Sequence, residues 1–235
     1  MPGTLIRRYK RFLAEVLLAD GQMVTAHCPN PGSMLSVNAA GSPVWLSRAE
    51  KPGRALGYTW ELIRVGETLV GINTCRPNRL VEEAIAARRL PELEGYATLR
   101  REVRYGCNSR IDLLLEGPGR ARCHVEIKNV TMKRGLSRDI PVAFPDSITV
   151  RGTKHLTELV EVVRQGGRAV MLYVTQRSDA ERLTFAADID YVYSRAVRVA
   201  LEAGVELLCY RCHVDLTQIR LADPIPITAP PSALG

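Results

Sequence analysis

Two acids and one lysine, Asp112, Glu126 and Lys128, are the side chains whose types and spacing could do chemistry together. Glu126 and Lys128 lie two residues apart in VEIKNV (125–130), where β-branched residues alternate with charged ones and predict a strand. Residues two apart on a strand point to the same face of a sheet. This face therefore carries two opposite charges where a sheet normally carries apolar side chains, and the charges need a partner.

Asp112 supplies that partner if two strands form a hairpin. It lies in the predicted strand 111–116, which the turn residues Gly117-Pro-Gly119 join to the strand of Glu126. A hairpin centred on Gly119 places Asp112 directly opposite Glu126, with Cβ atoms about 4.5–5.5 Å apart. A shift of the turn by one residue would separate the two acids, so the site depends on this register.

Two carboxylates at that distance repel each other, and a bound divalent cation relieves the repulsion. We therefore expect an Mg²⁺ or Mn²⁺ site formed by Asp112, Glu126 and the backbone carbonyl of Ile127. Lys128 lies about 6.6 Å along the strand from Glu126, within reach of a water or an anion held at the metal. The competing interpretation is a Glu–Lys ladder on an exposed strand, which explains many matches to this pattern.

Residues 1–77 are predicted to form a first domain, a small OB-like β-barrel that binds nucleic acid. Short strands separated by Gly, Pro and Asn turns are typical of such a five-stranded barrel. The fold indicates oligonucleotide binding without establishing it. The expected strands are 12–18, 22–27, 43–46, 58–65 and 68–73.

Residues 78–222 are predicted to form the second domain, which places the acids on a sheet. A helical period begins at 78–90, with Asn78 as candidate N-cap, and recurs at 153–164 and near 190–203. Strands are expected at 99–105, 111–116, 122–128, 169–174 and 205–210. The order is αβββαβ followed by αβ, which indicates an α/β domain (α+β over the whole chain) with a mixed central sheet. The Pro-rich tail, residues 223–235, is expected to lack structure.

The composition is that of a soluble globular protein, with 46% hydrophobic and 24% charged residues. No apolar run reaches the roughly 18 residues of a membrane span, and no signal peptide precedes the barrel, so we expect a cytoplasmic protein without a membrane partner. The net charge of +7 makes a polyanionic partner plausible. The haem-attachment pattern CYRCH (209–213) is interpreted as chance, because covalent attachment needs an exported chain.

The spacing of Asp112, Glu126 and Lys128, after a helix with an acidic residue, resembles the PD-(D/E)xK nuclease superfamily. Further motifs resemble the sugar fermentation stimulation protein family over about residues 5–210. They are LIRRYKRF (5–12), AHCPN (26–30), YTWE (58–61), GINT (71–74), EVRYG (102–106), SRID (109–112), VEIKNV (125–130), FPD (144–146) and RGTKHL (151–156). One departure is Pro31, where the family usually has Thr, which puts a ligand contact at that loop in doubt.

The resemblance implies a DNA-binding protein with an OB-like domain, a nuclease-like domain and a role in expressing sugar-catabolic genes. It also adds Glu83, the acid on the first helix, to the catalytic candidates Asp112, Glu126 and Lys128, with its carboxylate in the metal shell directly or through water. The competing interpretation of Glu83 is a solvated acid that the helix dipole favours.

Clusters of cations are the candidate nucleic-acid contacts. The first run surrounds an aromatic residue that could stack on a base, and comprises Arg7, Arg8, Tyr9, Lys10 and Arg11. A second group lies in the predicted flexible loop 132–142 and includes Lys133 and Arg134. A third opens the following helix, where backbone N–H groups favour a phosphate, and comprises Arg151, Lys154 and His155. Solvated faces, or a His155 packed against the sheet, are the alternatives.

Three functions remain open from the sequence. The first is metal-dependent hydrolysis of a phosphodiester, with Lys128 orienting a water or stabilising negative charge. The second is a non-catalytic DNA-binding regulator that keeps a nuclease fold. The third, a sugar-responsive binding module, depends on the family name alone. Because no helix-turn-helix pattern is evident, we expect DNA binding with little sequence specificity.

Overall fold

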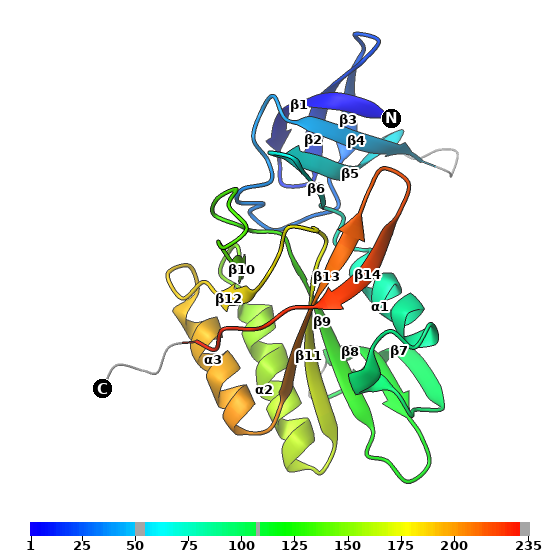
Figure 1. Cartoon of the computed structure of the whole chain (residues 1–235), viewed down its shortest axis with the longest axis vertical. Helices are drawn as coiled ribbons and strands as arrows, with labels where there is room; N and C mark the ends of the chain where they lie inside the picture. Colours follow the sequence, from blue (N-terminus) through cyan, green and yellow to red (C-terminus); the bar gives the residue numbers. More distant parts are fainter. Residues whose placement is uncertain (50–54, 107–108, 231–235) are drawn as a thin grey trace.

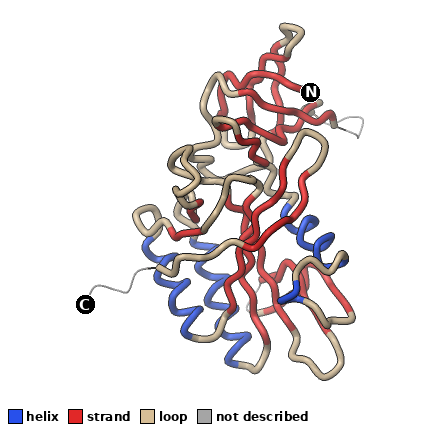
Figure 2. Tube along the Cα trace, in the orientation of Figure 1, coloured by secondary structure: helices blue, strands red, loops and turns tan. Residues whose placement is uncertain are grey.

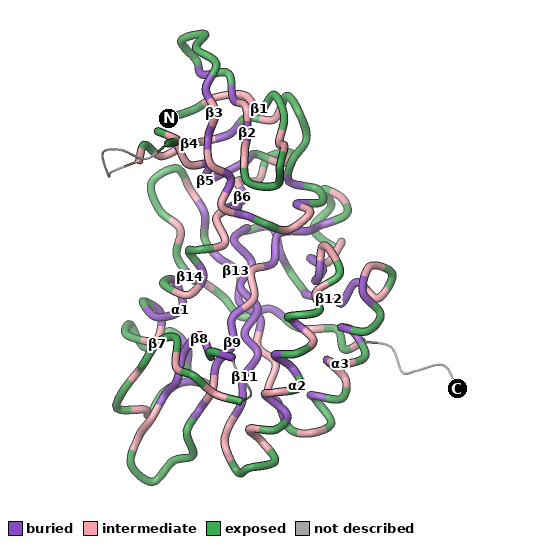
Figure 3. The backbone as a smooth tube through the Cα atoms, turned by 180° about the vertical axis from the view of Figure 1, so that it is seen from behind, coloured by how far each residue is buried: buried purple, intermediate pink, exposed green. Residues whose placement is uncertain are grey.

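The computed structural model describes residues 1–49, 55–106 and 109–230. A β-barrel sits on the end of a larger sheet that carries helices on both faces (Figure 1). Buried backbone runs through the barrel and along the central strands of the larger sheet, while the outer turns are exposed (Figure 3). Within the described ranges, no helix is long and apolar enough to cross a membrane.

The barrel is a ring of five strands, which confirms the predicted OB-like fold. The ring strands are β1 (Pro2–Tyr9), β2 (Leu13–Leu18), β3 (Met23–His27), β4 (Pro43–Arg48) and β5 (Tyr58–Val65), and a sixth strand, β6 (Thr68–Gly71), lies beside β5. They follow the order β3-β2-β1-β4-β5-β6, and a contact between His27 and Thr59 joins β3 to β5 and closes the ring. β6 pairs with β5 and leads the chain out of the barrel.

β1 is the strand that the sequence prediction missed. It pairs with both β2 and β4, although its sequence, PGTLIRRY, has little apolar alternation. Leu5 is its one fully buried side chain, and Arg7 is exposed. The strand is therefore held by its two neighbours rather than by a continuous apolar face.

The second domain is built on a mixed six-stranded sheet, as predicted. Its helices and strands are α1 (Pro77–Ala86), the 3₁₀ helix Pro91–Leu93, β7 (Thr98–Tyr105), β8 (Ser109–Glu116), β9 (Cys123–Val130), β10 (Val142–Phe144), α2 (Val150–Arg164), β11 (Arg168–Thr175), β12 (Leu183–Phe185), α3 (Tyr191–Glu202), β13 (Glu206–Val214) and β14 (Ile219–Pro224). The sheet order is β14-β13-β11-β9-β8-β7. β9, β11 and β13 are parallel, whereas β7, β8 and β14 are antiparallel to their neighbours.

The helices cover the two faces of this sheet unequally. α2 and α3 lie side by side on one face, and α1 lies on the other (Figure 2). Leu156 and Val197 of the helix pair pack on Met171 of β11, and Val81 of α1 packs in the second core with Val125 of β9. β9 is thus sandwiched between both layers, which holds the strand of Glu126 in place.

The prediction of an unstructured tail is wrong for its described part. β14 extends to Pro224, Ile225 is buried with its N–H donating to the Cys209 carbonyl, and Thr228 donates to the Leu183 carbonyl. Leu183 belongs to β12, which pairs in parallel with β10 in a separate two-stranded sheet. The prolines therefore shape an extended, packed segment, and residues 231–235 lie outside the described ranges.

The two domains are joined by backbone hydrogen bonds. Gly71, at the end of β6, donates its N–H to the Gln176 carbonyl at 2.8 Å, and Val70 forms an antiparallel bridge with Arg177. The Gln176 amide also donates to the Asn73 carbonyl at 3.0 Å and to the Asn129 side chain at 2.8 Å. The barrel is therefore hydrogen-bonded to the end of β11.

This joint leads to a first prediction, for Gly71→Ala. A Cβ at Gly71 would lie 2.6 Å from the Gln176 Oε1 and 2.9 Å from its Cβ, so Gln176 must move and its hydrogen bonds weaken. Overpacking of this kind costs about 1–3 kcal/mol of unfolding free energy, measured by urea titration. Gly57→Ala is the control, because no atom of the residues that the structure describes lies within 4 Å of a Cβ there. Equal stabilities for the two variants would contradict a tight joint.

Candidate functional site

The predicted register between the strands of Asp112 and Glu126 is confirmed. β8 and β9 pair Leu113 with Val125 and Leu115 with Cys123, and the next position sets Asp112 against Glu126. Ladder pairing stops there because Asp112 uses its side chain instead. Its carboxylate accepts the N–H of Ile127 at 2.7 Å through one oxygen and the Asn78 amide at 2.9 Å through the other. Asp112 is thereby fixed between α1 and β9.

Glu126 is held from the opposite side. Its Oε1 accepts hydrogen bonds from the Lys128 ammonium, at 2.6 Å, and from His155 Nδ1 on α2. Arg151, one turn earlier on α2, donates to His155 Nε2 at 3.3 Å. Because a guanidinium can only donate, Nε2 accepts from Arg151, and Nδ1 is the ring nitrogen that donates to Glu126.

The other oxygen of Glu126 has no such partner. Glu126 is 2% exposed, and its Oε2 is buried with no hydrogen-bond donor among the described residues. A buried acceptor without a donor is costly, so this oxygen needs a proton, a water or a cation beside it. One oxygen of Glu126 is therefore occupied by positioning contacts and the other is left for a ligand.

The pKa values of the two acids shift in opposite directions. Burial and the negative charge of Glu126 raise the pKa of Asp112 above its usual range, against the hydrogen bond from Ile127. Burial also raises the pKa of Glu126, but the hydrogen bond from His155 and the charge of Lys128 outweigh it and lower that pKa overall. Glu126 thus stays ionised at neutral pH, and its charge makes ionised Asp112 unfavourable.

The residues at this position fit a divalent cation. Across the described ranges, no three His, Cys, Asp or Glu side chains gather in a metal-holding group, so a metal here would need a backbone ligand as well. The N–H and C=O of one strand residue point to the same side of the strand, and the Ile127 N–H points at Asp112. Asp112, Glu126 Oε2 and the Ile127 carbonyl are oxygen donors of the kind that Mg²⁺ takes, and they are the groups that would hold it.

The acids form the floor of a pocket of about 440 Å³ between the two domains. The second domain contributes Asp112, Glu126 and Lys128, while the barrel side contributes the loop 30–32 and the linker residues 74 and 75. The lining residues place the pocket where the barrel meets the end of β9. A ligand bound at the acids would therefore touch both domains.

Glu83 does not belong to this pocket, so its predicted place in the metal shell is wrong. Its side chain is 49% exposed and pairs with Arg79 one turn earlier at 2.8 Å. The neighbouring Glu82 is the buried acid of α1, paired with Arg101 of β7, and burial raises its pKa. α1 also starts at Pro77, so Asn78 contacts Asp112 rather than capping the helix.

The cation run of β1 divides into structural and exposed members. Arg8 donates to the carbonyls of Asn30 and Gly32 at 2.8 Å, and so holds the barrel loop that lines the pocket. Arg7 is exposed, pairs with Glu15 and lies 5.0 Å from the Tyr9 ring. Lys10 and Arg11 are exposed in the turn to β2. The exposed residues remain candidates for nucleic-acid contact, whereas Arg8 has a structural role.

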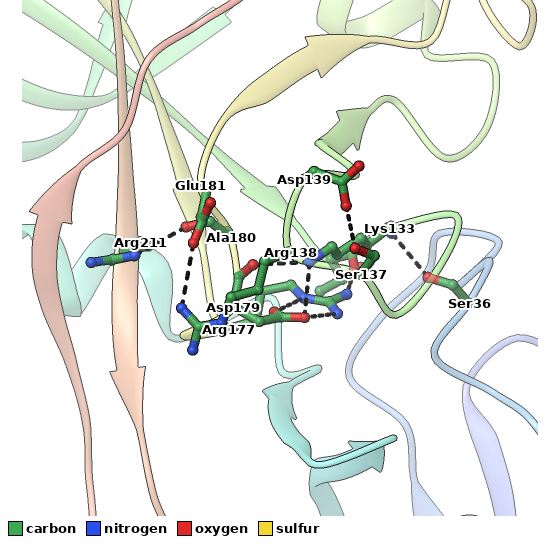
Figure 4. A network of polar contacts seen from close by, with 11 residues as sticks. Ser36, Lys133, Ser137, Arg138, Asp139, Arg177, Asp179, Ala180, Glu181 and Arg211 are labelled. Carbon is green, nitrogen blue, oxygen red and sulfur yellow. Dashed lines mark hydrogen bonds and ion pairs between the residues drawn. The ribbon is translucent and has the colours of Figure 1, made fainter.

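The loop 132–142 corrects a second prediction, because Lys133 is not a surface cation. Its side chain is 0% exposed and donates to the Asp179 carboxylate at 3.2 Å and to the Asp179 carbonyl at 2.9 Å (Figure 4). Arg177, 1% exposed, pairs with the same carboxylate at 2.6 Å. Lys133 therefore cannot reach a phosphate in this fold. Arg134 remains half exposed, paired with Asp188 at 2.7 Å.

The third cation group lies on α2 beside the pocket. Arg151 is exposed and lines the pocket, and Lys154 is half exposed, 3.7 Å from Glu158. His155 is buried and uses both ring nitrogens, one on Glu126 and one on Arg151. The predicted phosphate contact by His155 is therefore wrong, and the imidazole holds Glu126 instead. Arg151 remains a candidate phosphate ligand.

Sequence reasoning missed the contacts that tie the barrel loop to the pocket. Asp146 accepts the Met34 N–H at 2.8 Å, and Ser33 donates to the Asp146 carbonyl. Asn30 is 4% exposed and donates to the Ile72 carbonyl at 3.2 Å. The motifs FPD (144–146) and AHCPN (26–30) were the available signal, since two unusual loop motifs can meet in space.

A larger cavity of about 1130 Å³ lies elsewhere, between β7–β9 and the α2–α3 pair. It contains neither Asp112, Glu126 nor Lys128. Size alone would favour it, but the chemistry of the site requires the paired acids and the lysine, so the smaller interdomain pocket is the candidate site.

Comparison with known proteins covers both domains. The family model described as the sugar fermentation stimulation protein RE domain matches residues 75–218, and the SfsA N-terminal OB domain matches residues 6–72. The sugar fermentation stimulation protein homolog of Rhodospirillum rubrum is 52% identical over 97% of this chain and 96% of its own length. The homolog of Geobacter sulfurreducens is 54% identical over 97% of this chain and 95% of its own length.

A solved structure has the same fold. It is that of Pyrococcus furiosus SfsA in complex with Ca²⁺, with a TM-score of 0.86 at 26% identity, covering 97% of this chain and 95% of that chain. The correspondence includes both domains and so also their relative placement.

Proposed function

This chain belongs to the sugar fermentation stimulation protein family, and we propose that it binds DNA and hydrolyses its phosphodiester bonds with a divalent metal, Mg²⁺ or Mn²⁺. The observation that carries the proposal is the buried, unpartnered Glu126 Oε2 beside Asp112 and Lys128, within the part of the chain that the structure describes. The Ca²⁺ of the Pyrococcus furiosus relative supports a divalent cation in this family.

The chain's own residues would divide the work of hydrolysis. A bound metal would supply positive charge to a phosphate oxygen and acidify a water. Lys128, 15% exposed, would donate to the attacking water or to a phosphate oxygen and stabilise negative charge there. His155 and Lys128 would keep Glu126 ionised and aimed, and Asn78 would do the same for Asp112.

Charge supports the DNA-binding part of the proposal. The chain carries a net charge of +7, and the exposed cations Arg7, Lys10, Arg11 and Arg151 lie on the barrel and at the pocket. Contacts of this kind are made to phosphates and carry no base information, so binding would have little sequence specificity and would weaken with salt.

A non-catalytic regulator of sugar-catabolic genes is the second candidate. It is favoured by one observation, that no third carboxylate joins Asp112 and Glu126 within residues 1–49, 55–106 and 109–230. A two-carboxylate site binds a cation more weakly than a richer one, so the fold would persist with a poorly loaded metal.

The direct test is a cleavage assay with labelled DNA in Mg²⁺, in Mn²⁺ and in EDTA. The proposal expects cleavage in either metal and none in EDTA. Binding without cleavage in every metal would support the regulator instead.

Asp112→Asn gives a second, activity-independent prediction. The folded pKa of Asp112 lies above its unfolded value, so its charge destabilises the cation-free fold at neutral pH, and this cost disappears below about pH 4. The substituted amide can keep both hydrogen bonds if the Asn78 amide flips. The variant should therefore melt higher than the parent in EDTA at pH 7.

The same variant should lose stabilisation by metal. At 100 times its Kd, a cation that binds only the folded parent adds about 2.7 kcal/mol, whereas Asp112→Asn removes one ligand and most of that gain. Calorimetric melting in EDTA and in Ca²⁺ measures both effects. An equal Ca²⁺ gain in parent and variant would place the cation elsewhere.

A further inference from the structure

We infer that the substrate enters this pocket as a single strand of nucleic acid, not as a duplex. The inference rests on the proposed function, because it concerns what reaches Asp112 and Glu126. It follows from three features. A barrel loop, residues 30–33 (the roof), borders the pocket that contains the acids; hydrogen bonds between the two domains (the joint) hold that loop in place; and the pocket is small.

The roof is the barrel loop 30–33, which is fixed from two sides. From the barrel, the Arg8 guanidinium donates to the carbonyls of residues 30, 32 and 33 at 2.8, 2.8 and 3.3 Å. From the second domain, Asp146 accepts the Met34 N–H. The Asp146 carboxylate lies so near Gly32 that a Cβ there would be 2.9 Å from both of its oxygens. The loop is therefore clamped above the pocket.

The joint between the domains keeps that roof in place. Three contacts cross from the barrel and linker to the segment that follows β11: the Gly71 N–H bond, the Val70–Arg177 bridge and the bond from the Gln176 amide to the Asn73 carbonyl. The same amide is held within the second domain by Asn129 of β9. Swinging the barrel away would break these bonds and those of Asp146 together. A duplex therefore cannot gain access through a hinge at this joint without that loss.

The remaining space suits one strand. The pocket volume of about 440 Å³ is that of a small-ligand site, which typically measures about 300–1,000 Å³. A B-form duplex has a major groove alone about 12 Å wide and carries its phosphates on a rigid cylinder. Glu126 is only 2% exposed at the bottom of the pocket. A phosphate can reach it only if its strand separates from the rigid duplex. A flexible single strand can bring its phosphate in.

The test uses a bulky side chain at the pocket rim. Cys75 is exposed and lines the pocket, so Cys75→Trp should narrow the entrance without disturbing a core. Met23→Trp is the matched control, because Met23 is 54% exposed on β3 and lies outside the pocket. The substrates are a labelled 12-nucleotide single strand, as DNA and as RNA, its blunt duplex, and a duplex with an unpaired 3′ flap.

Cleavage in Mg²⁺ should be at least about tenfold faster on the single strand and the flap than inside the duplex. Fluorescence anisotropy in EDTA and in Ca²⁺ should show at least a tenfold weaker affinity of Cys75→Trp for the single strand, and parent affinity for Met23→Trp. Equal internal cleavage of the blunt duplex, or undiminished single-strand binding by Cys75→Trp, would overturn the inference. If the parent protein cleaves none of the substrates, the proposed hydrolysis is refuted. The single-strand affinity of Cys75→Trp relative to the parent then still tests whether a single strand enters the pocket. Faster cleavage of one strand chemistry identifies DNA or RNA.

Discussion

Lys128→Ala is expected to lower metal-dependent cleavage by at least about 100-fold while nearly preserving nucleic-acid affinity. The loss of one preorganised donor to developing charge typically costs about 10²–10³ in rate. The ammonium of Lys128 is well placed for that role, since it lies 2.6 Å from Glu126 Oε1 at the pocket floor and is only 15% exposed. Affinity should change little, because one recessed charge is removed and the exposed cations of the barrel remain.

Glu83→Gln is the matched control for this experiment. The motif resemblance placed Glu83 in the metal shell, whereas the structure places it on the exposed side of α1, paired with Arg79. Its neutralisation should leave the cleavage rate within about twofold of the parent. Initial rates on a labelled strand at saturating Mg²⁺ measure both variants. A Lys128→Ala enzyme that cleaves at the parent rate would assign the activity to another site or to a contaminant.

The acid pair could be predicted from the sequence because its geometry is local. Gly117-Pro-Gly119 sets the hairpin, the hairpin sets the register, and the register alone brings Asp112 to Glu126. Period-2 alternation in β9 then assigns Lys128 to the same face. Each step depends only on residues that are close in the sequence, so the position of the acid pair can be predicted from the sequence alone.

The failures concern residues whose position depends on distant packing. Glu82 and Glu83 are adjacent on α1, and the rotation of that helix against β7 and β9 decides which of them is buried. Lys133 looks like a loop cation until Asp179, 46 residues later, pairs with it inside the protein. Sequence spacing reports neither the rotation of α1 nor the pairing of Lys133 with Asp179.

The same pairing makes Asp179→Ala the most destabilising change that we predict. The Asp179 carboxylate bonds two buried cations, Arg177 at 2.6 and 2.9 Å and Lys133 at 3.2 Å. Removing it would leave both charges inside the fold without a counterion. Removing one partner of a buried ion pair typically costs about 3–5 kcal/mol of unfolding free energy. Here Asp179 is the common partner of two such pairs, with Arg177 and with Lys133.

Lowering the pH should reduce the difference in unfolding free energy between the parent and Asp179→Ala. Burial raises the pKa of Asp179, but the hydrogen bond and charge of Arg177, with Lys133, outweigh it and lower that pKa overall. Because the pKa of Asp179 is lower in the folded than in the unfolded state, its ionised carboxylate stabilises the fold at pH values above the unfolded pKa of about 3.9. This stabilisation is lost as the pH falls through the folded pKa. Urea titrations at pH 7 and below pH 4 should therefore show a large gap that narrows in acid.

Asp188→Ala is the control that separates burial from charge. Asp188 also pairs with a loop cation, Arg134, at 2.7 Å, but both side chains are at least half exposed. An exposed pair is worth about 0–1 kcal/mol, so this variant should unfold near the parent midpoint at either pH. Similar losses for Asp179→Ala and Asp188→Ala would mean that Lys133 reaches solvent. Lys133 would then be free to meet a phosphate, as its sequence position first suggested, because only burial with Asp179 removes it from that role.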